Sequence, residues 1–488
     1  MSEGQGTRFL KGSAWMIAMR WSMRFMGLFS MTIVARMLTP ADFGVFAIAM
    51  TFIGLISVLT DTGADLALIR HPDPQRQHYD TVWTFNLLMH VLSAVLIAAS
   101  SILAEHVYKD TRYESLLLVI ALSMLISGFN NIGTVDFRRN MQFNKEFQYN
   151  VAVQLVGVSA TIVAAYLLHS YWALIVGSLA RSLTGIFLSY AMHPYRPKFS
   201  LSARHEMFGF SFWNMFRSLA LFISGRGDRL ILAAYFGATE IGFFSVTGEL
   251  AGMAVYELLH PIGRALLPSL TAMRREDGWD ANSVKKIFNG TATLAMVTGI
   301  GLSAVATPAI TLVYGQQFAA AAPMLAIMAL IAAVSGFSQP LGQFLIALGK
   351  ARELALLYAL QAVLMLAATW ALSAKGAGIY AIVWAKFCVE VIALLRLFYL
   401  LRYIKNVNWK DLLVSWVRPI LAAAFMYGVV TELLMTLSTS SPGLQIAVAI
   451  PTGALAYSVA LFALWHLMLR PPGIEEEIMQ RLIRKARA

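Results

Sequence analysis

The sequence predicts an all-α integral membrane protein with about fourteen transmembrane helices. Hydrophobic residues make up 58% of the 488 residues, charged residues only 13%, and the mean hydropathy is +0.65. A soluble chain would carry about 25% charged residues. Apolar runs of about 20 residues recur along the chain, and each is long enough to cross a hydrocarbon core about 30 Å thick.

The apolar runs place the expected helices in order along the chain. We expect them at residues 14–34, 43–64, 82–104, 114–135, 147–168, 171–192, 208–233, 241–271, 288–313, 321–347, 354–373, 377–401, 412–436 and 445–468. The first run contains Arg20 and Arg24 and lacks a small-residue cleavage site, so we expect it to remain as a signal anchor. The lone Cys388 excludes an internal disulfide framework.

The net charge of +12 would suggest a nucleic-acid partner in a soluble protein. Here the excess lies in alternate connections between helices. With the N-terminus in the cytoplasm, the inner connections hold 24 Lys and Arg residues, and the opposite ones hold only Arg36, Lys109, Arg112 and Lys375. This bias follows the positive-inside rule. It predicts a multi-pass protein of a bacterial cytoplasmic membrane, with both termini cytoplasmic and no nucleic-acid partner.

The chain also repeats itself. A shift of 198 residues places ARMLTPADFGVF (35–46) on AAYFGATEIGFF (233–244), which aligns Gly44 with Gly242. A second match relates 127–131 to 335–339. Such parallel repeats are typical of transporters that rock two lobes about a central site. We therefore expect a six-helix lobe at 1–192, a cytoplasmic linker at 193–207, a second six-helix lobe at 208–403, two further helices at 404–469 and a basic cytoplasmic tail at 470–488.

Arginines inside the expected helices are candidates for binding an anionic substrate. A charge at the bilayer centre costs about 2.5–3.5 kcal/mol even on a lenient insertion scale. Arg24 lies about 15 Å into its helix, where a role in a hydrated cavity is expected. Arg20 is shallower and could instead snorkel to the interface. Arg181 is also central, and Arg217 shares a helix face with Asp228.

One expected helix carries a polar stripe. Glu257, His260 and Arg264 are spaced i, i+3, i+7 and fall on one face. Pro261 and Pro268 lie in the same run, as is typical of a helix that bends or lines a cavity. A structural polar seam between helices is the alternative interpretation. We add Arg264 to the substrate-binding candidates.

Acidic residues inside the expected helices are candidates for ion coupling. Asp61, Glu257 and Glu390 could bind a proton or cation, because burial can raise a carboxyl pKa toward the working range. Glu257 is the first candidate, because it shares a stripe with His260 and Arg264. Lys386 and Glu390 are spaced i,i+4, so we expect them mainly to neutralise each other.

Sequence signals for an enzyme are lacking. No Walker A pattern, nucleophile elbow or zinc-ligand spacing occurs. His71, Asp73, His78 and Asp80 share one cytoplasmic connection and could hold a metal, although a solvated loop is the simpler interpretation. The outer connections are too short for a catalytic domain. We therefore expect a non-enzymatic protein without metal or cofactor.

Several stretches of the chain resemble one family of exporters. IVARMLTPADFGVFAIA (33–49) and LTDTGADLALIR (59–70) resemble the start of Wzx-type polysaccharide or O-antigen flippases of the multidrug/oligosaccharidyl-lipid/polysaccharide exporter superfamily. RRNMQFNKEF (138–147) and DRLILAAYFGATEIGFFSV (228–246) are similar to its lipopolysaccharide and exopolysaccharide biosynthesis transporters. The resemblance covers about residues 5–440.

This resemblance implies a V-shaped, two-lobed bundle that flips undecaprenyl-diphosphate-linked oligosaccharide by alternating access. Membrane lipids, a polysaccharide polymerase and chain-length proteins are the implied partners. In the related lipid II flippases, helix 1 has an arginine pattern that Arg24, Gly27 and Arg36 match. The relatives' second Arg-Asp pair is replaced here by Ser30-Met31, and their arginine late in helix 2 has no counterpart. Arg264 is the implied stand-in for their arginine on helix 8.

Two other functions remain open from the sequence. A multidrug or organic cation exporter of the same superfamily should have an acidic cavity, whereas ten bases and seven acids lie within the expected helices here. A membrane-embedded polysaccharide polymerase would need a large outer loop or an acidic catalytic site, and neither is evident.

Overall fold

The computed structural model describes residues 3–60, 63–108, 110–204, 212–276, 281–400, 409–468, 475–476 and 479. In these ranges the regular structure is helical, and no strand occurs among them. The chain folds as two compact units, Met1–Gly242 (unit 1) and Phe243–Ala488 (unit 2).

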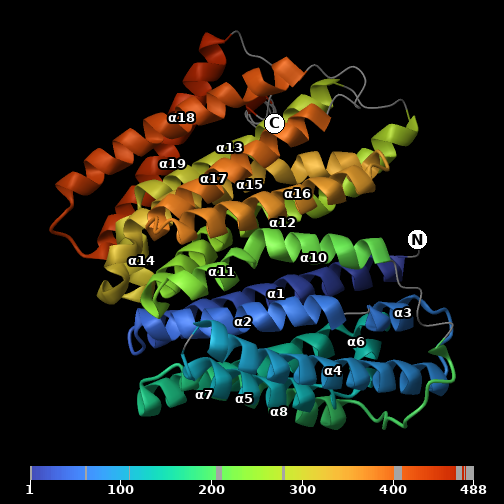
Figure 1. Cartoon of the computed structure of the whole chain (residues 1–488). Helices are drawn as coiled ribbons and strands as arrows, with labels where there is room; N and C mark the ends of the chain where they lie inside the picture. Colours follow the sequence, from blue (N-terminus) through green and yellow to red (C-terminus); the bar gives the residue numbers. More distant parts are fainter. Residues whose placement is uncertain are drawn as a thin grey trace. The chain divides into compact units, whose positions relative to one another are not determined.

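Unit 1 consists of long helices that run alongside one another and of short helices that join or extend them (Figure 1). The long helices are α1 (Glu3–Val34), α2 (Pro40–Thr60), α4 (Arg76–Tyr108), α5 (Arg112–Ser127), α7 (Phe143–Leu168), α8 (Trp172–Met192) and α10 (Phe212–Arg226). The short ones are α3 (Ala64–Arg70), η1 (Ile132–Thr134), α6 (Val135–Arg139) and α11 (Asp228–Tyr235). Helix α12 (Ala238–Glu276) begins in unit 1 and continues into unit 2.

Unit 2 is a second helical bundle. Its helices are α13 (Ala281–Ala304), α14 (Ala306–Tyr314), η2 (Gln316–Ala321), α15 (Ala322–Ala347), α16 (Ala351–Ala374), α17 (Ile379–Leu400), α18 (Trp409–Thr436) and α19 (Pro442–Leu467). Helix α13 packs against α15 and α18, α17 packs against α15 and α16, and α18 pairs with α19.

The expected multi-pass helical architecture is confirmed. In the described ranges, nine helices are long and apolar enough to cross a membrane, or ten if α5 and the η1–α6 segment form one span bent by 69°. The bend replaces the continuous helix expected at 114–135. There the side chain of Asn131 accepts a 2.9 Å hydrogen bond from the Gly133 N–H, which starts a new turn.

Two other expected helices are divided, and one is longer than expected. The run at 208–233 divides at Gly227 between α10 and α11, and the run at 288–313 divides at Val305 between α13 and α14. Helix α12, in contrast, continues through Pro261 and Pro268. Proline is tolerated within membrane helices when neighbouring groups satisfy the carbonyl groups that it frees.

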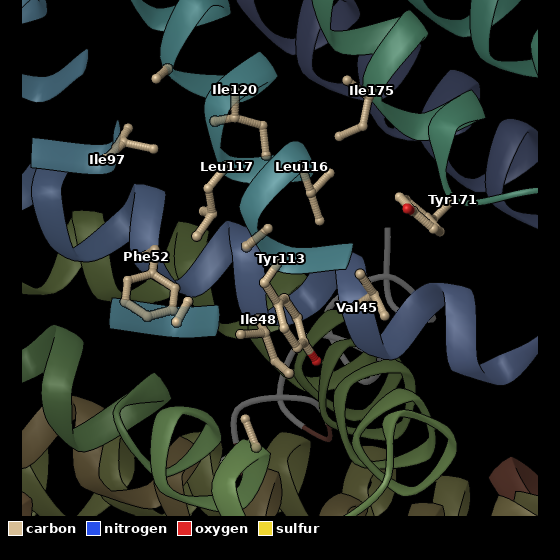
Figure 2. Close-up of a cluster of buried hydrophobic side chains, with 14 of the residues drawn as sticks. Val45, Ile48, Phe52, Ile97, Tyr113, Leu116, Leu117, Ile120, Tyr171 and Ile175 are labelled. Carbon is tan, nitrogen blue, oxygen red and sulfur yellow. The ribbon is translucent and has the colours of Figure 1, made fainter. Parts of the chain in front are cut away.

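The core of unit 1 lies between α2, α4, α5 and α8 (Figure 2). On α2, Val45, Ile48, Phe52 and Ile56 recur every three or four residues and form one buried stripe. The stripe packs against residues from the facing helices, namely Ile97, Leu116, Leu117, Ile120 and Ile175. This packing fixes the first turns of α2 and α5, which lie next to the features described below.

The first turns of α2 and α12 lie in direct backbone contact. A Cβ atom on Gly44 would lie 1.8 Å from the carbonyl oxygen of Ala238, and one on Gly242 would lie 1.9 Å from that of Pro40. The contact is reciprocal, because the 198-residue shift relates Gly44 to Gly242 and Pro40 to Ala238. Only glycine allows such a close approach of two helices.

Acidic residues cap both of these helices at equivalent positions. Asp42 Oδ2 accepts hydrogen bonds from the Thr39 N–H (2.9 Å) and hydroxyl (2.6 Å). Glu240 Oε2 accepts one from the Gly237 N–H (3.2 Å). Carboxylates at a helix N-terminus satisfy unpaired N–H groups and offset the helix dipole. The other oxygen of Asp42 accepts the Tyr171 N–H at 3.1 Å, which fixes the start of α8.

The segment that follows α8 is held against the start of α4. Asp80 accepts a 2.5 Å hydrogen bond from the Tyr195 hydroxyl and a 3.0 Å bond from the Lys198 N–H. Asn131 donates a 2.7 Å bond to the Tyr195 carbonyl oxygen. Burial and the bond to Asp80 raise the pKa of Tyr195 above its ordinary value. These contacts anchor the first part of the expected linker.

Candidate functional site

Glu390 lies within α17 and accepts hydrogen bonds from two neighbouring helices. The Ser335 hydroxyl of α15 donates at 2.5 Å, and the Gln361 side-chain amide of α16 donates at 2.7 Å. Helices α15, α16 and α17 pack together within unit 2. The two donors stabilise the ionised carboxylate, and a bound proton would compete with them. The arrangement therefore suits a group whose charge changes during a cycle.

Lys386 lies one turn before Glu390 on the same helix. Its ammonium group lies 5.3 Å from the centroid of the Phe244 ring of α12. A cation over an aromatic ring is stabilised by the negative face of that ring. Lys386 therefore has an aromatic partner in addition to its i,i+4 neighbour, and the charge of Glu390 is also stabilised by neutral donors.

A similar contact occurs in unit 1, 208 residues earlier. Ser127 on α5 donates a 2.9 Å hydrogen bond to Ser182 on α8, and Ser182 lies 3.1 Å from the Ser123 hydroxyl. Ser335 and Glu390 follow Ser127 and Ser182 by the same 208 residues. In each unit a serine therefore donates a hydrogen bond to a residue of the second long helix that follows it. The acceptor is the hydroxyl of Ser182 in unit 1 and the carboxylate of Glu390 in unit 2.

Arg24 lies on α1, away from the face that packs against α7. That face contains Gly12, Trp15 and Met19, which contact Phe143, Phe147 and Asn150 of α7. Arg24 is half-buried. Gly27 follows three residues later, on the same side of the helix, and a Cβ atom there would meet nothing within 4 Å. This side of α1 is therefore not packed against a neighbouring helix of unit 1 at Gly27.

Arg181 lies on α8, where that helix crosses α7 closely. A Cβ atom on Gly157 of α7 would lie 3.0 Å from Arg181 Nε, so the arginine side chain lies over this glycine. The arginine is nevertheless exposed. Helices α1 and α8, which carry Arg24 and Arg181, both pack against α7.

The other candidates are only partly described. Arg217 lies in α10 and Arg264 in α12, but their side-chain positions fall outside the described part of the structure. Glu257 is an exposed residue of α12. Asp61 follows the end of α2 and lies outside the described residues.

Arg418 is a further charge within a spanning helix, and it forms a buried ion pair. Its Nη1 atom lies 3.1 Å from Glu475 Oε1, and the two side chains are 1% and 0% exposed. Glu476, the next residue, lies 3.7 Å from the Lys286 ammonium of α13. The pair compensates the charge of Arg418 with a residue from the tail.

Sequence reasoning identified Glu390 but missed its two hydrogen-bond donors. Ser335 begins the repeated segment at 335–339, and Gln361 is an isolated amide in the apolar run of α16. A side-chain amide in such a run needs a partner on another helix, and that need is the signal that could have indicated Gln361. A serine hydroxyl can instead bond a carbonyl of its own helix, so Ser335 gave no such signal.

Comparisons with known proteins agree with this architecture. The model of a family described as "Polysaccharide biosynthesis protein" matches residues 33–323. The chain is 23% identical to the succinoglycan biosynthesis transport protein ExoT of Rhizobium meliloti (strain 1021), over 93% of this chain and 91% of that protein. It is also 23% identical to the teichuronic acid biosynthesis protein TuaB of Bacillus subtilis (strain 168), over 82% and 84% of the two chains.

Solved structures show the same fold. The lipid II flippase MurJ in an inward closed conformation matches with a TM-score of 0.68 and 15% identity, over 94% of this chain and all of that one. An inward-facing multidrug resistance transporter of the MATE family matches with a TM-score of 0.58 and 13% identity, over 79% and 96%.

Proposed function

This chain belongs to the family of polysaccharide biosynthesis proteins, as its resemblance predicts, and we propose that it is a flippase for lipid-linked oligosaccharides. It would move undecaprenyl-diphosphate-linked oligosaccharide from the inner to the outer leaflet of a bacterial cytoplasmic membrane. The relatives named for succinoglycan and teichuronic acid biosynthesis support a polysaccharide precursor as cargo. The observation that carries the proposal is a polar site within an apolar helix bundle, formed by Glu390, Ser335 and Gln361.

We propose the following layout for the membrane-embedded chain. Two six-helix lobes, 1–192 and 208–403, are joined by the linker 193–207 and followed by two helices in 404–469 and the tail 470–488. The lobes form a V-shaped bundle of fourteen helices with both termini in the cytoplasm. Support comes from the reciprocal contact of Gly44 and Gly242 and from the equivalent hydrogen bonds of Ser127 and Ser335, because related positions make related contacts.

In this proposal arginines bind the diphosphate of the substrate. A guanidinium group presents paired donors that match phosphate oxygens, and it keeps its charge inside a membrane. We assign this role to Arg24 first and Arg264 second, with Arg181 and Arg217 as further candidates. The half-buried position of Arg24 and the open space at Gly27 support the assignment. The polyprenyl tail can remain in lipid throughout.

Carboxylates would couple the cycle to an ion gradient. We rank Glu390 first because it accepts hydrogen bonds from residues of two other helices. A change in its charge therefore changes the contacts that hold these helices of unit 2 together. When a proton or cation neutralises the carboxylate, the bonds from Ser335 and Gln361 weaken, and the balance between two helix arrangements can shift. Glu257 and Asp61 are the other candidates.

The proposal includes no chemical step, so the protein would act as a transporter and not as an enzyme. A polysaccharide polymerase and chain-length proteins would use the flipped product on the outer side, and membrane lipids would surround the bundle.

The decisive experiment is deletion of the coding gene in the native host, followed by extraction of lipids from inside-out membrane vesicles. We expect undecaprenyl-diphosphate oligosaccharide to accumulate on the cytoplasmic face and to disappear when the gene is restored. A strain that instead gains sensitivity to cationic dyes, with no such lipid, would support the cation exporter. Accumulation of complete repeat units on the outer face would support a polymerase.

A further inference from the structure

Unit 1 contains a pocket of about 480 Å³ that none of the assignments above uses. It lies where the connection between α4 and α5 meets the connection between α11 and α12. The volume is within the range of about 300–1,000 Å³ that is typical of small-molecule sites. The walls are well fixed, since Ala238 is in backbone contact with Gly44, and the Tyr108 hydroxyl donates to the Leu230 carbonyl oxygen at 3.1 Å.

The charged groups of the pocket compensate one another. Arg112 donates to Asp110 through Nε, 3.0 Å from each carboxylate oxygen, and through Nη2 at 2.7 Å. These bonds hold the pKa of Asp110 below its ordinary value, so the pair is ionised and has no net charge. The adjoining helix N-termini are also capped, because Asp110 accepts the Arg112 N–H and Glu240 accepts the Gly237 N–H. The site therefore offers little attraction to a phosphate or to a cation.

The remaining lining is mainly polar. Among its aromatic residues, Tyr108 and Phe236 are half-buried, and Tyr113 is only 3% exposed because it packs into the core of unit 1. The rings of Tyr108 and Tyr113 meet edge to face with centroids 5.3 Å apart, and Phe236 adds a third ring. Figure 2 shows the ring of Tyr113 extending away from α5. The hydroxyl of Thr111 and the outer atoms of the Asp110–Arg112 pair supply donors and acceptors. A neutral set of hydrogen-bonding groups beside the half-buried rings of Tyr108 and Phe236 matches a pyranose, which has apolar C–H faces and a rim of hydroxyl groups.

We propose that this pocket binds an uncharged sugar residue, and that the cargo's oligosaccharide supplies that residue. The second part of the inference rests on the proposed function. In the proposed topology, Arg112 lies on the side opposite the basic connections, so the pocket would receive the sugar after it has crossed and would favour release in that direction.

A variant that fills the pocket provides the test. Gly237 lines the pocket, its φ is not in the left-handed region, and a Cβ atom there would meet only Glu240, at 4.0 Å. Gly237→Trp should therefore fill the space with little disturbance of the fold. Gly378→Trp is the matched control, because Gly378 also faces open space but lies in unit 2. Arg112→Gln is a second variant that unbalances the charge of the site and leaves its volume nearly unchanged.

Binding is measured on the purified full chain in lipid nanodiscs by saturation-transfer NMR. The probes are methyl glucoside, methyl galactoside and N-acetylglucosamine, with inorganic phosphate and tetraethylammonium as competitors. We expect a signal from at least one sugar that neither ion displaces. The signal should fall about tenfold in Gly237→Trp and in Arg112→Gln, and it should persist in Gly378→Trp. The absence of a sugar signal from the native protein, equal signals in native and Gly237→Trp protein, or displacement by phosphate would each overturn the proposal.

Flipping of the lipid-linked oligosaccharide is assayed on the same preparations, which separates the two claims. If the native protein flips the lipid but Gly237→Trp binds sugar normally, only the sugar site fails. If the native protein flips no lipid but binds the sugar, the site stands and the proposed cargo fails.

Discussion

Gly44 and Gly242 lie 198 residues apart and face each other so closely that neither helix can carry a side chain at the crossing. Each would place a Cβ atom within 2 Å of a carbonyl oxygen of the opposite helix, 1.8 Å for Gly44 and 1.9 Å for Gly242. Since the clashing groups are backbone atoms, a change of side-chain rotamer cannot relieve the overlap.

Gly44→Ala and Gly242→Ala should therefore each destabilise the protein, by about 1–3 kcal/mol or more, as overpacking typically does. The measurement is the thermal midpoint of the detergent-solubilised protein, followed by size-exclusion chromatography. Gly428→Ala on α18 is the control, because a Cβ atom there meets nothing within 4 Å. That variant should be neutral or gain up to about 1 kcal/mol from helix propensity. Equal midpoints for all three variants would contradict the close crossing.

The second prediction concerns Glu390. Glu390→Gln removes the charge that Ser335 and Gln361 stabilise, so transport driven by an ion gradient should fall about tenfold or more, which corresponds to at least about 1.4 kcal/mol in the barrier. Ser335→Ala should give an intermediate loss. The assay is flipping in proteoliposomes with and without an imposed gradient. Glu432→Gln is the control, since Glu432 is exposed on α18. A Glu390→Gln protein that responds fully to the gradient would remove this carboxylate from the coupling mechanism.

The third prediction concerns the ion pair of Arg418 and Glu475. Removing one partner leaves a buried charge, so Glu475→Gln should cost about 3–5 kcal/mol in stability or release the tail. The double variant Arg418→Met with Glu475→Leu should cost much less, because it removes both charges. The measurement is the thermal midpoint of the single and double variants, which shows whether the single variant loses more stability than the double one. A single variant as stable as the native protein would show that the pair does not hold the tail in solution.

The fourth prediction tests the proposed topology. Cys388 is exposed and must first be replaced by serine. Single cysteines are then placed at Thr111, in the connection before α5, and at Lys145, in the first turn of α7; both positions are exposed. An impermeant thiol reagent added to intact cells should label position 111 and spare position 145. Labelling of both positions, or of position 145 alone, would reject the arrangement inferred from the distribution of basic residues.

Much of the architecture could be predicted because it depends on local composition. Apolar runs long enough to span a membrane must become helices there, since only a helix satisfies its own backbone groups. The break after Ser127 could not be predicted in this way. It depends on the Asn131 side chain, which lies in an otherwise apolar run and accepts a hydrogen bond from the Gly133 N–H. That bond replaces the backbone hydrogen bond that a continuous helix would make there.

The candidate site, too, could be predicted from the sequence only in part. Glu390 stands out in the sequence because an ionisable group in an apolar run is costly. Its donors Ser335 and Gln361 are 55 and 29 residues away, so their approach depends on how three helices pack and not on any local pattern. Likewise, the 198-residue shift related Gly44 to Gly242 but could not show that the two residues touch.

The last prediction is that Arg24 binds the diphosphate of the substrate. Arg24 is half-buried on a helix that packs against α7 through a different face, and open space begins one turn further on, at Gly27. Each charge-assisted hydrogen bond to phosphate is worth about 1.5–3 kcal/mol. Arg24→Ala should therefore slow flipping about 10–100-fold at normal protein levels, with lipid-linked oligosaccharide accumulating on the cytoplasmic face.

Two further variants distinguish phosphate binding from a structural role of Arg24. Arg24→Lys keeps the charge but loses the paired donors, so its rate should lie between those of the native protein and Arg24→Ala. Gly27→Leu fills the adjacent space without touching the α7 face, so it should slow flipping while the thermal midpoint stays unchanged. Arg264→Ala, in unit 2, should resemble Arg24→Ala if both arginines share the diphosphate. If Arg24→Ala and Arg264→Ala both flip the lipid at the native rate, the diphosphate binds elsewhere, and Arg181 and Arg217 become the residues to test, because they are the remaining arginine candidates within the helices.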